Sequence, residues 1–438
     1  MTPDPGESLG PGAHLPRYTF HNFMDGDVQV PLRTSGFTRR CALIAAGFAS
    51  PYVAGECWPL ASASSDIQQK PRKVGLDEPL ADESTTLAIQ TCLDARSDAL
   101  MRGDRQAFVA TIDQRNPTWR RIQGDVFDLS SRGGWGPTAT YSPVQLQDKP
   151  LGYVKAFLEV SPSRGVAPAE RTTWVFSRQA DGTVLHAEPT NDELGIRQTT
   201  SIGTVVLSHY NWDADIVDRV AAVAQTAWTR VSSIIELPKM IRPIVSLNPT
   251  YAAHSGLRGF STWAAYLPGS RDTVLLRSLE SFGAGPVQIT ETEDSRLLIP
   301  LTHELTHLAT DCVLSIVKIP HWMSEGLAEY VADNFRTREF SSAVASNRQW
   351  SLDKASEIIE WGSDISRGYT ANDISLAYAH ASHGTRYFVE RFGITRFWEL
   401  AREFASSRRW AESFLTVTTV SWSDFGADWF RWSKGIFA

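Results

Sequence analysis

Cysteine is scarce in this chain. Four of the 438 residues are cysteines, and two of these, Cys41 and Cys57, lie near the amino end. If that end is removed on export, only Cys92 and Cys312 remain. Two thiolates cannot build a metal site on their own, so a cysteine-based metal centre is excluded. A disulfide between the two requires that the fold bring their Cα atoms within about 7 Å, which the sequence leaves open.

Positive charge is also in deficit, with 42 basic residues against 49 acidic ones and a net charge of −7. This balance, together with the lack of a nucleic-acid motif, argues against a nucleic-acid-binding protein. The sequence shows no internal repeat, and we expect no stable membrane span in the mature chain. A hydrophobic content of 42% is ample for two or three packed domains.

The amino end has the pattern of an export signal. Residues 1–37 are rich in proline, glycine and polar residues. Arg39 and Arg40 then form a basic region, residues 41–55 are mostly apolar, and residues 61–63 offer a small-x-small cleavage site at Ala63. The segment resembles a twin-arginine signal, but Ala42 stands where that signal usually has phenylalanine. An ordinary secretory signal and a buried amphipathic segment are the alternatives; we expect an exported protein.

The remaining chain predicts an α+β fold in two parts after a leader and linker at residues 1–75. Residues 76–200 begin with a helical pattern that is broken at Arg102-Gly103-Asp104, which we interpret as a helix–helix turn. Alternating runs at 153–160 and 171–178 follow, and Asp181-Gly182 indicates a hairpin. Residues 201–438 begin with a helix that carries Val220, Ala227 and Val231 on one face, continue with short strands, and end in helices.

The segment "LTHELTHLATD" in this second part contains two histidines four residues apart. On an α-helix, His303 and His307 share a face and can bind one ion. Two histidines and a carboxylate form a catalytic zinc set that leaves one position for water, and Glu304 is placed to take a proton from that water. An H-E-x-x-H string arises by chance in about one chain of this size per hundred, so a second element is needed.

That second element is "WMSEGLAEY", where Pro320 breaks the chain and Ser324 is expected to cap a new helix. A returning helix can bring Glu325 to the same ion. Glu329 lies four residues further on and is placed to accept a hydrogen bond from a ligand histidine. The alternative is a surface helix with solvated side chains, but the neighbouring residues Leu301, Leu305, Leu308, Val313 and Leu327 are apolar.

The combined motifs resemble the gluzincin zinc metallopeptidases, especially the peptidase-MA-like group, from residue 211 to the carboxyl end. The resemblance implies a zincin-like, mainly helical domain with a small mixed sheet. It also implies Zn²⁺ held by His303, His307 and Glu325, with Glu304 as general base and a peptide or protein as substrate. Residues 76–200 resemble the nuclear-transport-factor-like domain in the order of helices and sheet and in "ARSDALMRGDRQAFVATID", which implies an accessory domain.

A downstream segment, "AYAHASHGTRYFVERFG", resembles the tyrosine helix of zinc aminopeptidases in the same clan. Tyr378 and Gly393 stand at that family's interval, so Tyr378 is expected to donate a hydrogen bond to the oxyanion of the reaction. A core tyrosine is the alternative, and His380 or His383 could replace Tyr378 as the donor. For each of these histidines alone, a buried structural role is favoured.

The sequence departs from zinc aminopeptidases at the element that determines their substrate specificity. The acidic strand with which such aminopeptidases bind the substrate's amino terminus has no counterpart between residues 249 and 300. The run "FSTWAAYLPGS" can supply an edge strand for an extended peptide, so endopeptidase action stays open. Three hypotheses follow in order: an exported zinc metallopeptidase, a catalytically silent scaffold or peptide-binding protein that retains the metal, and a structural protein without metal. The oligomeric state is left open.

Overall fold

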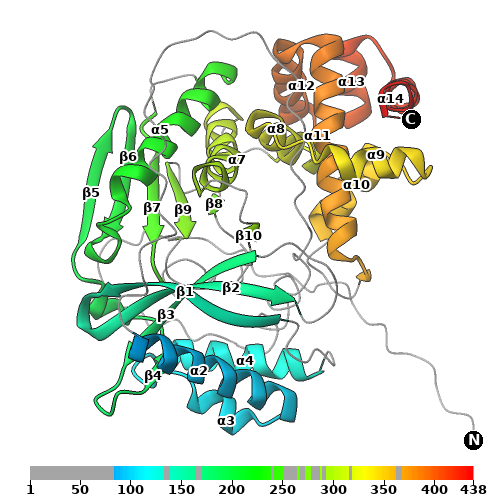
Figure 1. The fold of residues 1–438 in the computed structure, drawn as a ribbon. Coiled ribbons are helices and arrows are strands. Elements are labelled where there is room, and N and C mark those ends of the chain that lie inside the picture. The colour runs from blue at the N-terminus through cyan, green and yellow to red at the C-terminus, as the bar shows by residue number, and fades with distance from the viewer. Residues whose placement is uncertain are drawn as a thin grey trace, which may run out of the picture.

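The computed structural model describes residues 83–132, 139–162, 170–237, 241–250, 264–266, 272–277, 287–288, 293–314, 318–361 and 367–437. These residues form a mixed α and β fold with two sheets and many helices (Figure 1). The expected leader, with its Arg39-Arg40 pair and Ala63 cleavage site, lies outside the described residues.

The first part is a sheet covered by helices. Three helices come first, and four antiparallel-paired strands follow. They are α2 (Glu83–Arg102), α3 (Arg105–Ala110) and α4 (Pro117–Arg132), then β1 (Ala139–Lys149), β2 (Tyr153–Pro162), β3 (Glu170–Arg178) and β4 (Val184–His186). The helices lie along one face of this sheet (Figure 1), where apolar residues of α2 pack against β2 and β3.

Local sequence explains the turns of this part. Gly103 has a φ of +66°, and Asp104 caps α3 by accepting a hydrogen bond from the Ala107 N–H at 2.9 Å. The Arg102-Gly103-Asp104 string is therefore the predicted helix–helix turn. Gly182, with a φ of +85°, closes the predicted hairpin between β3 and β4. Both predictions are confirmed.

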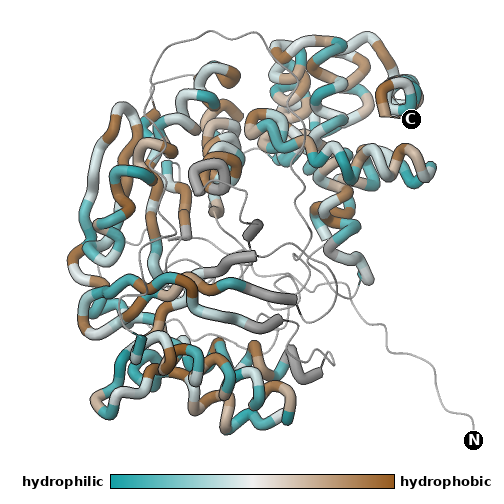
Figure 2. The backbone as a smooth tube through the Cα atoms, viewed as in Figure 1, coloured by the Kyte–Doolittle hydropathy of each residue, from teal (hydrophilic) through white to brown (hydrophobic). Residues whose placement is uncertain are grey.

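The second sheet has the order β5-β6-β7-β9-β8, with β6, β7 and β9 parallel and the two outer strands antiparallel to their neighbours. Helix α5 packs on it through Val220, Ala227 and Val231, as predicted. In Figure 2 the hydrophobic stretches of α5 lie next to those of β7 and β9, where the main core forms. The elements are β5 (Arg197–Ile202), β6 (Val205–Tyr210), α5 (Val217–Ile234), β7 (Ile244–Asn248), β8 (Ala264–Tyr266) and β9 (Thr273–Arg277).

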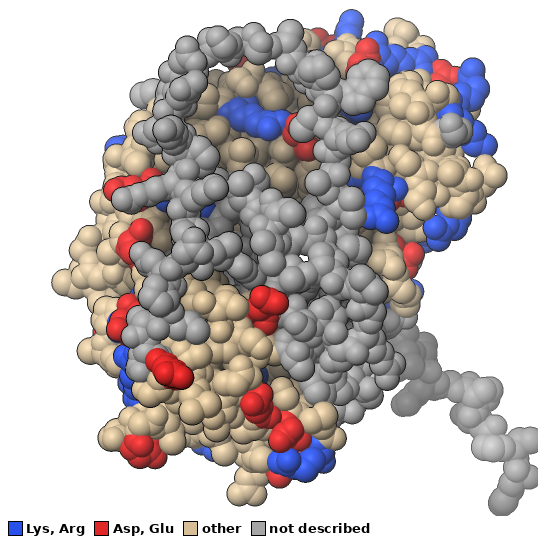
Figure 3. Space-filling model, in the orientation of Figure 1, with Lys and Arg blue, Asp and Glu red and all other residues tan. Residues whose placement is uncertain are grey.

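Eight helices complete the described chain, and most of their apolar faces belong to the same core as the second sheet. Basic side chains are frequent over α12 and α13 at the upper right of Figure 3, whereas acidic ones are more frequent over the sheets at the lower left. The helices are α7 (Glu293–Leu314), α8 (His321–Ala332), α9 (Thr337–Ala345), α10 (Leu352–Trp361), α11 (Ala371–Phe392), α12 (Ile394–Ser407), α13 (Trp410–Thr418) and α14 (Trp422–Phe437).

The two parts are connected in two ways. A short strand that precedes α7, β10 (Val287–Gln288), pairs with β3 and thus extends the first sheet. The buried Lys149 also forms an ion pair at 2.9 Å with Asp215, which lies just before α5. The expected division near residue 200 stays a prediction, although β5 already belongs to the second sheet.

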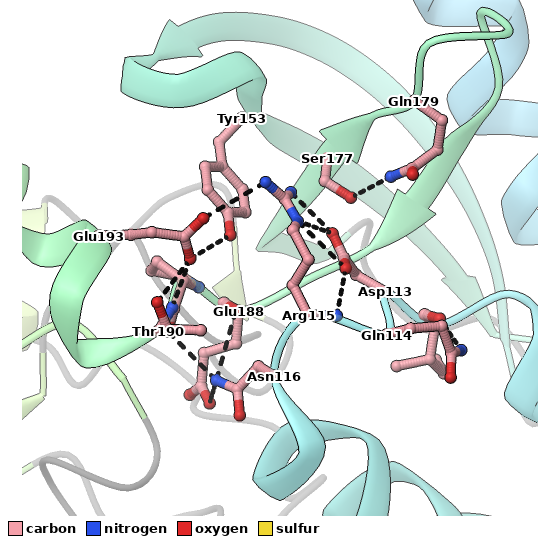
Figure 4. Close-up of polar contacts among 12 residues, drawn as sticks. Asp113, Gln114, Arg115, Asn116, Tyr153, Ser177, Gln179, Glu188, Thr190 and Glu193 are labelled. Atoms are coloured by element: carbon pink, nitrogen blue, oxygen red, sulfur yellow. Dashed lines mark hydrogen bonds and ion pairs between the residues drawn. The ribbon is translucent and has the colours of Figure 1, made fainter.

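A polar cluster lies beside this connection (Figure 4). Arg115 reaches between Asp113, at 2.7 Å, and Glu193, at 3.3 Å. The Tyr153 hydroxyl donates a hydrogen bond to Glu193 at 2.8 Å, and its ring packs on Trp212 of the following segment. The cluster therefore fixes the loop that leads from the first sheet into the second. The described residues also form short 3₁₀ turns at Pro150–Gly152, between β1 and β2, and at Asn191–Leu194 and Asn211–Asp213.

Cys92 and Cys312 are not joined in a disulfide, and Cys92 is buried in the first part. Among the described residues, no helix has the length and apolar character needed to cross a membrane.

Candidate metal centre

Helix α7 presents the two histidines of the H-E-x-x-H string on one face. Leu301, Leu305 and Leu308 on the same helix have no exposed surface and anchor α7 in the core. His303 and His307 are half-buried beside them, and their Nε2 atoms are 3.1 Å apart. Core packing therefore fixes the pair, as the i, i+4 spacing predicts.

Helix α8 brings Glu325 to the same place, but it begins earlier than predicted. Pro320 is the N-cap residue and His321 the first helical residue. The expectation that Ser324 caps this helix is wrong, because the fixed φ of Pro320 already starts the helix there. Ser324 instead lies inside the first turn, where its Oγ is 3.4 Å from the Nδ1 atom of His307.

The three side chains converge. Oε2 of Glu325 lies 3.2 Å from the Nε2 atom of His303 and 3.3 Å from that of His307. Zinc binds nitrogen and oxygen at about 2.0–2.2 Å in a tetrahedron, which places ligand atoms about 3.3 Å apart. The separations of 3.1, 3.2 and 3.3 Å therefore match one face of such a tetrahedron. Among the described residues, His303, His307 and Glu325 are the group of three with metal-ligand spacing.

A second carboxylate lies on the Nδ1 side of the His303 ring. Oε1 of Glu329, four residues after Glu325, is 3.5 Å from the Nδ1 atom of His303. Glu329 is 2% exposed, and Arg336 lies 3.4 Å from the same oxygen. Because Nδ1 of His303 faces Glu329 and Nδ1 of His307 faces Ser324, both Nε2 atoms are directed to the centre.

The charges in this cluster shift the pKa values of its members. Burial lowers the pKa of His303, but hydrogen bonds with Glu325 and Glu329 outweigh burial and raise it well above the usual value. Burial raises the pKa of Glu325, and the nearby His307 and His303 lower it well below its usual range. The carboxylates of Glu325 and Glu329 therefore favour a positive charge at His303.

Glu304 lies between the histidine pair and the second sheet. Its Oε2 accepts a 2.6 Å hydrogen bond from the backbone N–H of Tyr266 in β8, the outermost strand of that sheet among the described strands. The other oxygen, Oε1, makes no hydrogen bond with the described residues. One oxygen is therefore held by the sheet edge, and the other is available to a molecule that enters the site.

Helix α11 places Tyr378 next to these residues. The ring centroids of Tyr378 and His303 are 6.4 Å apart, and the guanidinium of Arg336 lies 5.4 Å from the tyrosine ring. Burial and then the charges of Glu325 and Glu329 raise the pKa of Tyr378 well above 10. The hydroxyl makes no hydrogen bond with the described residues, so Tyr378 presents a neutral O–H donor at the site.

The two histidines of α11 lie elsewhere, so the idea that either replaces Tyr378 as a donor is wrong. His380 accepts a hydrogen bond from the Trp350 backbone N–H at 3.0 Å, and its Nδ1 lies 2.7 Å from the Leu376 carbonyl. His383 stacks on Phe340, with centroids 4.2 Å apart. Both rings have no exposed surface, because they are on other faces of α11 than Tyr378. Burial lowers the pKa of His380 to about 4 and that of His383 to about 3.

Close packing of α8 on α11 holds Glu325 in position. At Gly326, an added Cβ would lie 2.4 Å from the Ala381 carbonyl oxygen and 2.4 Å from the Thr385 hydroxyl. No residue with a side chain fits this contact without moving one of the helices. The glycine that follows Glu325 therefore allows α8 to approach α11 closely.

Three contributions to the site were missed in the sequence. They are the position of Ser324 beside His307, the Tyr266 N–H, and Arg336 beside Glu329. Arg336 has a left-handed backbone beyond the end of α8, and no local pattern indicated its direction.

Neither the scan against protein-family models nor the search of curated proteins finds a match to this chain.

Proposed function

We propose that the chain is a zinc-dependent peptidase of the gluzincin type. The observation that carries the proposal is the convergence of two imidazole nitrogens and one carboxylate oxygen at mutual distances of 3.1–3.3 Å. This donor set, with one open position, is that of a catalytic rather than a structural zinc site. His303, His307 and Glu325 would hold the ion.

When bound by His303, His307 and Glu325, a zinc ion would supply Lewis acidity, which would make water a nucleophile at neutral pH and polarise a carbonyl group. The residues of the chain supply the remaining functions. Glu304 takes the proton of the attacking water at its free Oε1 while the Tyr266 N–H holds Oε2 in place. The same carboxyl then delivers that proton to the leaving amine.

Tyr378 donates its hydroxyl proton as a hydrogen bond to the negative charge that develops on the substrate carbonyl oxygen. Its raised pKa keeps it in the donor form, and it has no competing hydrogen bond among the described residues. Glu329 orients His303 and is itself fixed by Arg336. Each of these residues thus has one task in the proposed reaction.

The position of strand β8 favours a peptide as the substrate. It is the outer strand beside β9 among the described strands, and it contacts Glu304 directly. An extended peptide that pairs with this edge would place its carbonyl groups beside the site. We propose a peptide or protein substrate, cleaved internally, and an accessory role for the first α+β part. Export of the protein is proposed from the amino-terminal motif alone.

The test compares the wild type with Glu304→Gln, which keeps the shape of the side chain and removes the base. Both proteins are loaded with zinc, the metal is counted by elemental analysis, and cleavage of an unbiased peptide mixture is followed by mass spectrometry. We expect equal zinc content and a loss of at least about a thousandfold in hydrolysis. Glu412→Gln, the same exchange at an exposed glutamate on α13, should retain turnover within a few-fold.

Three outcomes contradict parts of the proposal. Equal cleavage by Glu304→Gln refutes the assigned base. Zinc binding with no cleavage by the wild type supports the silent scaffold instead. If zinc is absent after purification without chelator and is not taken up on addition, the site is structural and holds no metal.

A further inference from the structure

The first α+β part encloses a positive charge that has no acidic partner among the described residues. Arg96 of α2 is 7% exposed, and its guanidinium carbon lies 4.0 Å from the Phe108 ring centroid and 5.5 Å from that of Trp174. One nitrogen, Nη2, donates to the Gln123 side-chain oxygen, whereas Nη1 has no hydrogen-bond partner. No ion pair to Arg96 is formed within the part of the chain that the structure describes.

Burying the Arg96 guanidinium without a counter-ion destabilises the folded state. Burial lowers the pKa of Arg96 to about 10, which leaves the side chain charged at neutral pH. A buried charge without a counter-ion strongly destabilises a fold. Aromatic faces such as Phe108 and Trp174 offset only a part of this effect. An anion beside Nη1 would restore the balance.

Two further buried nitrogens without partners lie in the same interior. These are Nε1 of Trp119 on α4 and Nδ1 of His186 on β4, whose residues are 2% and 4% exposed. The ring of His186 contacts that of Trp119, with centroids 5.1 Å apart, and stacks on Trp174 at 4.5 Å. Burial and the nearby charge of Arg96 lower the pKa of His186 well below its usual value, so it is neutral.

Arg96 and His186 both lie against Trp174, and Trp119 lies against His186, so the three side chains are neighbours in one aromatic cluster. Tyr141 and Trp174 border this cluster and are only half-buried. Buried hydrogen-bonding groups normally have partners, and three neighbouring groups without one among the described residues can serve a single polar ligand.

We propose that this interior is a binding site for a small monocarboxylate with an apolar or aromatic body. The planar fork of Arg96 matches a carboxylate, and the Trp119 N–H supplies a further donor. The body of the ligand packs on Phe108 and Trp174. A single cation in neutral, aromatic surroundings balances one negative charge, which favours a monocarboxylate over a phosphate dianion. The proposal does not depend on the metal centre.

The experiment uses the full chain and two probes, benzoate and butyrate, at pH 7 in buffer without other carboxylates. Binding is measured by isothermal titration calorimetry, and the melting temperature is followed with and without probe. Arg96→Met removes the charge and keeps the length of the side chain. Arg121→Met changes an exposed arginine on α4 and serves as the matched control.

We expect saturable binding of at least one probe and an increase in melting temperature for the wild type and for Arg121→Met, but not for Arg96→Met. Without probe, Arg96→Met should melt at or above the wild-type temperature, because an unbalanced charge is removed. Trp119→Phe keeps the ring and removes one donor, and it should weaken binding about tenfold.

Several results would overturn the proposal. One is that no probe binds the wild type at millimolar concentration, and another is that Arg96→Met responds like the wild type. Failure of Arg96→Met to fold would show that Arg96 stabilises the protein without a ligand. An equal shift produced by chloride alone would identify a site for simple inorganic anions instead.

Discussion

Replacement of His383 by phenylalanine tests whether this histidine has a structural or a catalytic role. His383 has no exposed surface and stacks on Phe340. Burial, and then the charges of Arg386 and His380, lower its pKa to about 3. The Phe335 carbonyl opposes a small part of this shift, but neither ring nitrogen makes a hydrogen bond of normal geometry with the described residues. A phenylalanine ring fills the same space without a group to protonate.

The size of the effect follows from proton uptake by the unfolded chain. An unfolded histidine has a pKa of about 6.5, whereas folded His383 stays neutral down to about pH 3. The unfolded state therefore binds more protons as the pH falls below 6.5, and stability decreases with falling pH. Between pH 8 and pH 5 this lowers the free energy of unfolding by about 2 kcal/mol for one such histidine.

The assay is urea unfolding of the wild type and of His383→Phe at a series of pH values from 8 to 5. The difference between the two proteins cancels the contributions of all other titrating groups. We expect His383→Phe to gain about 2 kcal/mol relative to the wild type over this range, and to retain peptide hydrolysis within a few-fold.

His380→Phe is the informative comparison. It removes the partners of the Trp350 N–H and the Leu376 carbonyl, so it should lose about 1–3 kcal/mol already at pH 8. An identical pH dependence of the wild type and His383→Phe would refute the argument that His383 is buried in its neutral form. A loss of turnover in His383→Phe without a loss of stability would show that His383 has a catalytic role.

Three further predictions concern the metal centre. Tyr378→Phe should fold normally, because the hydroxyl has no partner among the described residues, but lose about 100- to 1,000-fold in kcat with little change in KM. Glu329→Gln should weaken zinc binding about 10- to 100-fold, measured by competition with a chelator, because His303 loses its charged partner. Gly326→Ala should lower the free energy of unfolding by about 1–3 kcal/mol, measured by urea unfolding, because its Cβ meets the Ala381 carbonyl oxygen.

Each of these has a defined control. Gly435→Ala places a Cβ in open space on α14 and should stabilise the protein slightly through helix propensity; an equal effect at both glycines would argue against the close contact. Unchanged zinc affinity in Glu329→Gln would show that His303 is oriented by other groups. A rise in KM alone in Tyr378→Phe would assign the tyrosine to substrate binding.

The sequence predicts the elements that depend on local spacing. Helical periodicity was sufficient to place His303 and His307 on one face and Glu325 and Glu329 on another helix, because residues three and four apart are neighbours on any α-helix. The glycine turns at Gly103 and Gly182 follow in the same way from the φ values that they adopt.

Contacts between residues far apart in the sequence could not be predicted from local spacing. The pairing of β10 with β3 joins residues more than 100 positions apart, and the contact of Tyr266 with Glu304 depends on how a sheet edge meets a helix. The position of His380 was in principle predictable, since it lies two residues from Tyr378 and therefore on another face of the same helix. The start of α8 was misjudged because a serine was preferred over the preceding proline as its N-cap.

The pairing of β10 with β3 has a practical consequence. The backbone that enters the histidine-bearing helix passes first through the sheet of the other part, so removal of residues 83–178 would leave that stretch of backbone without its neighbouring strand. Truncation is therefore a poor way to isolate the part that carries His303 and His307. Dissection by point substitution within the intact polypeptide is the better route.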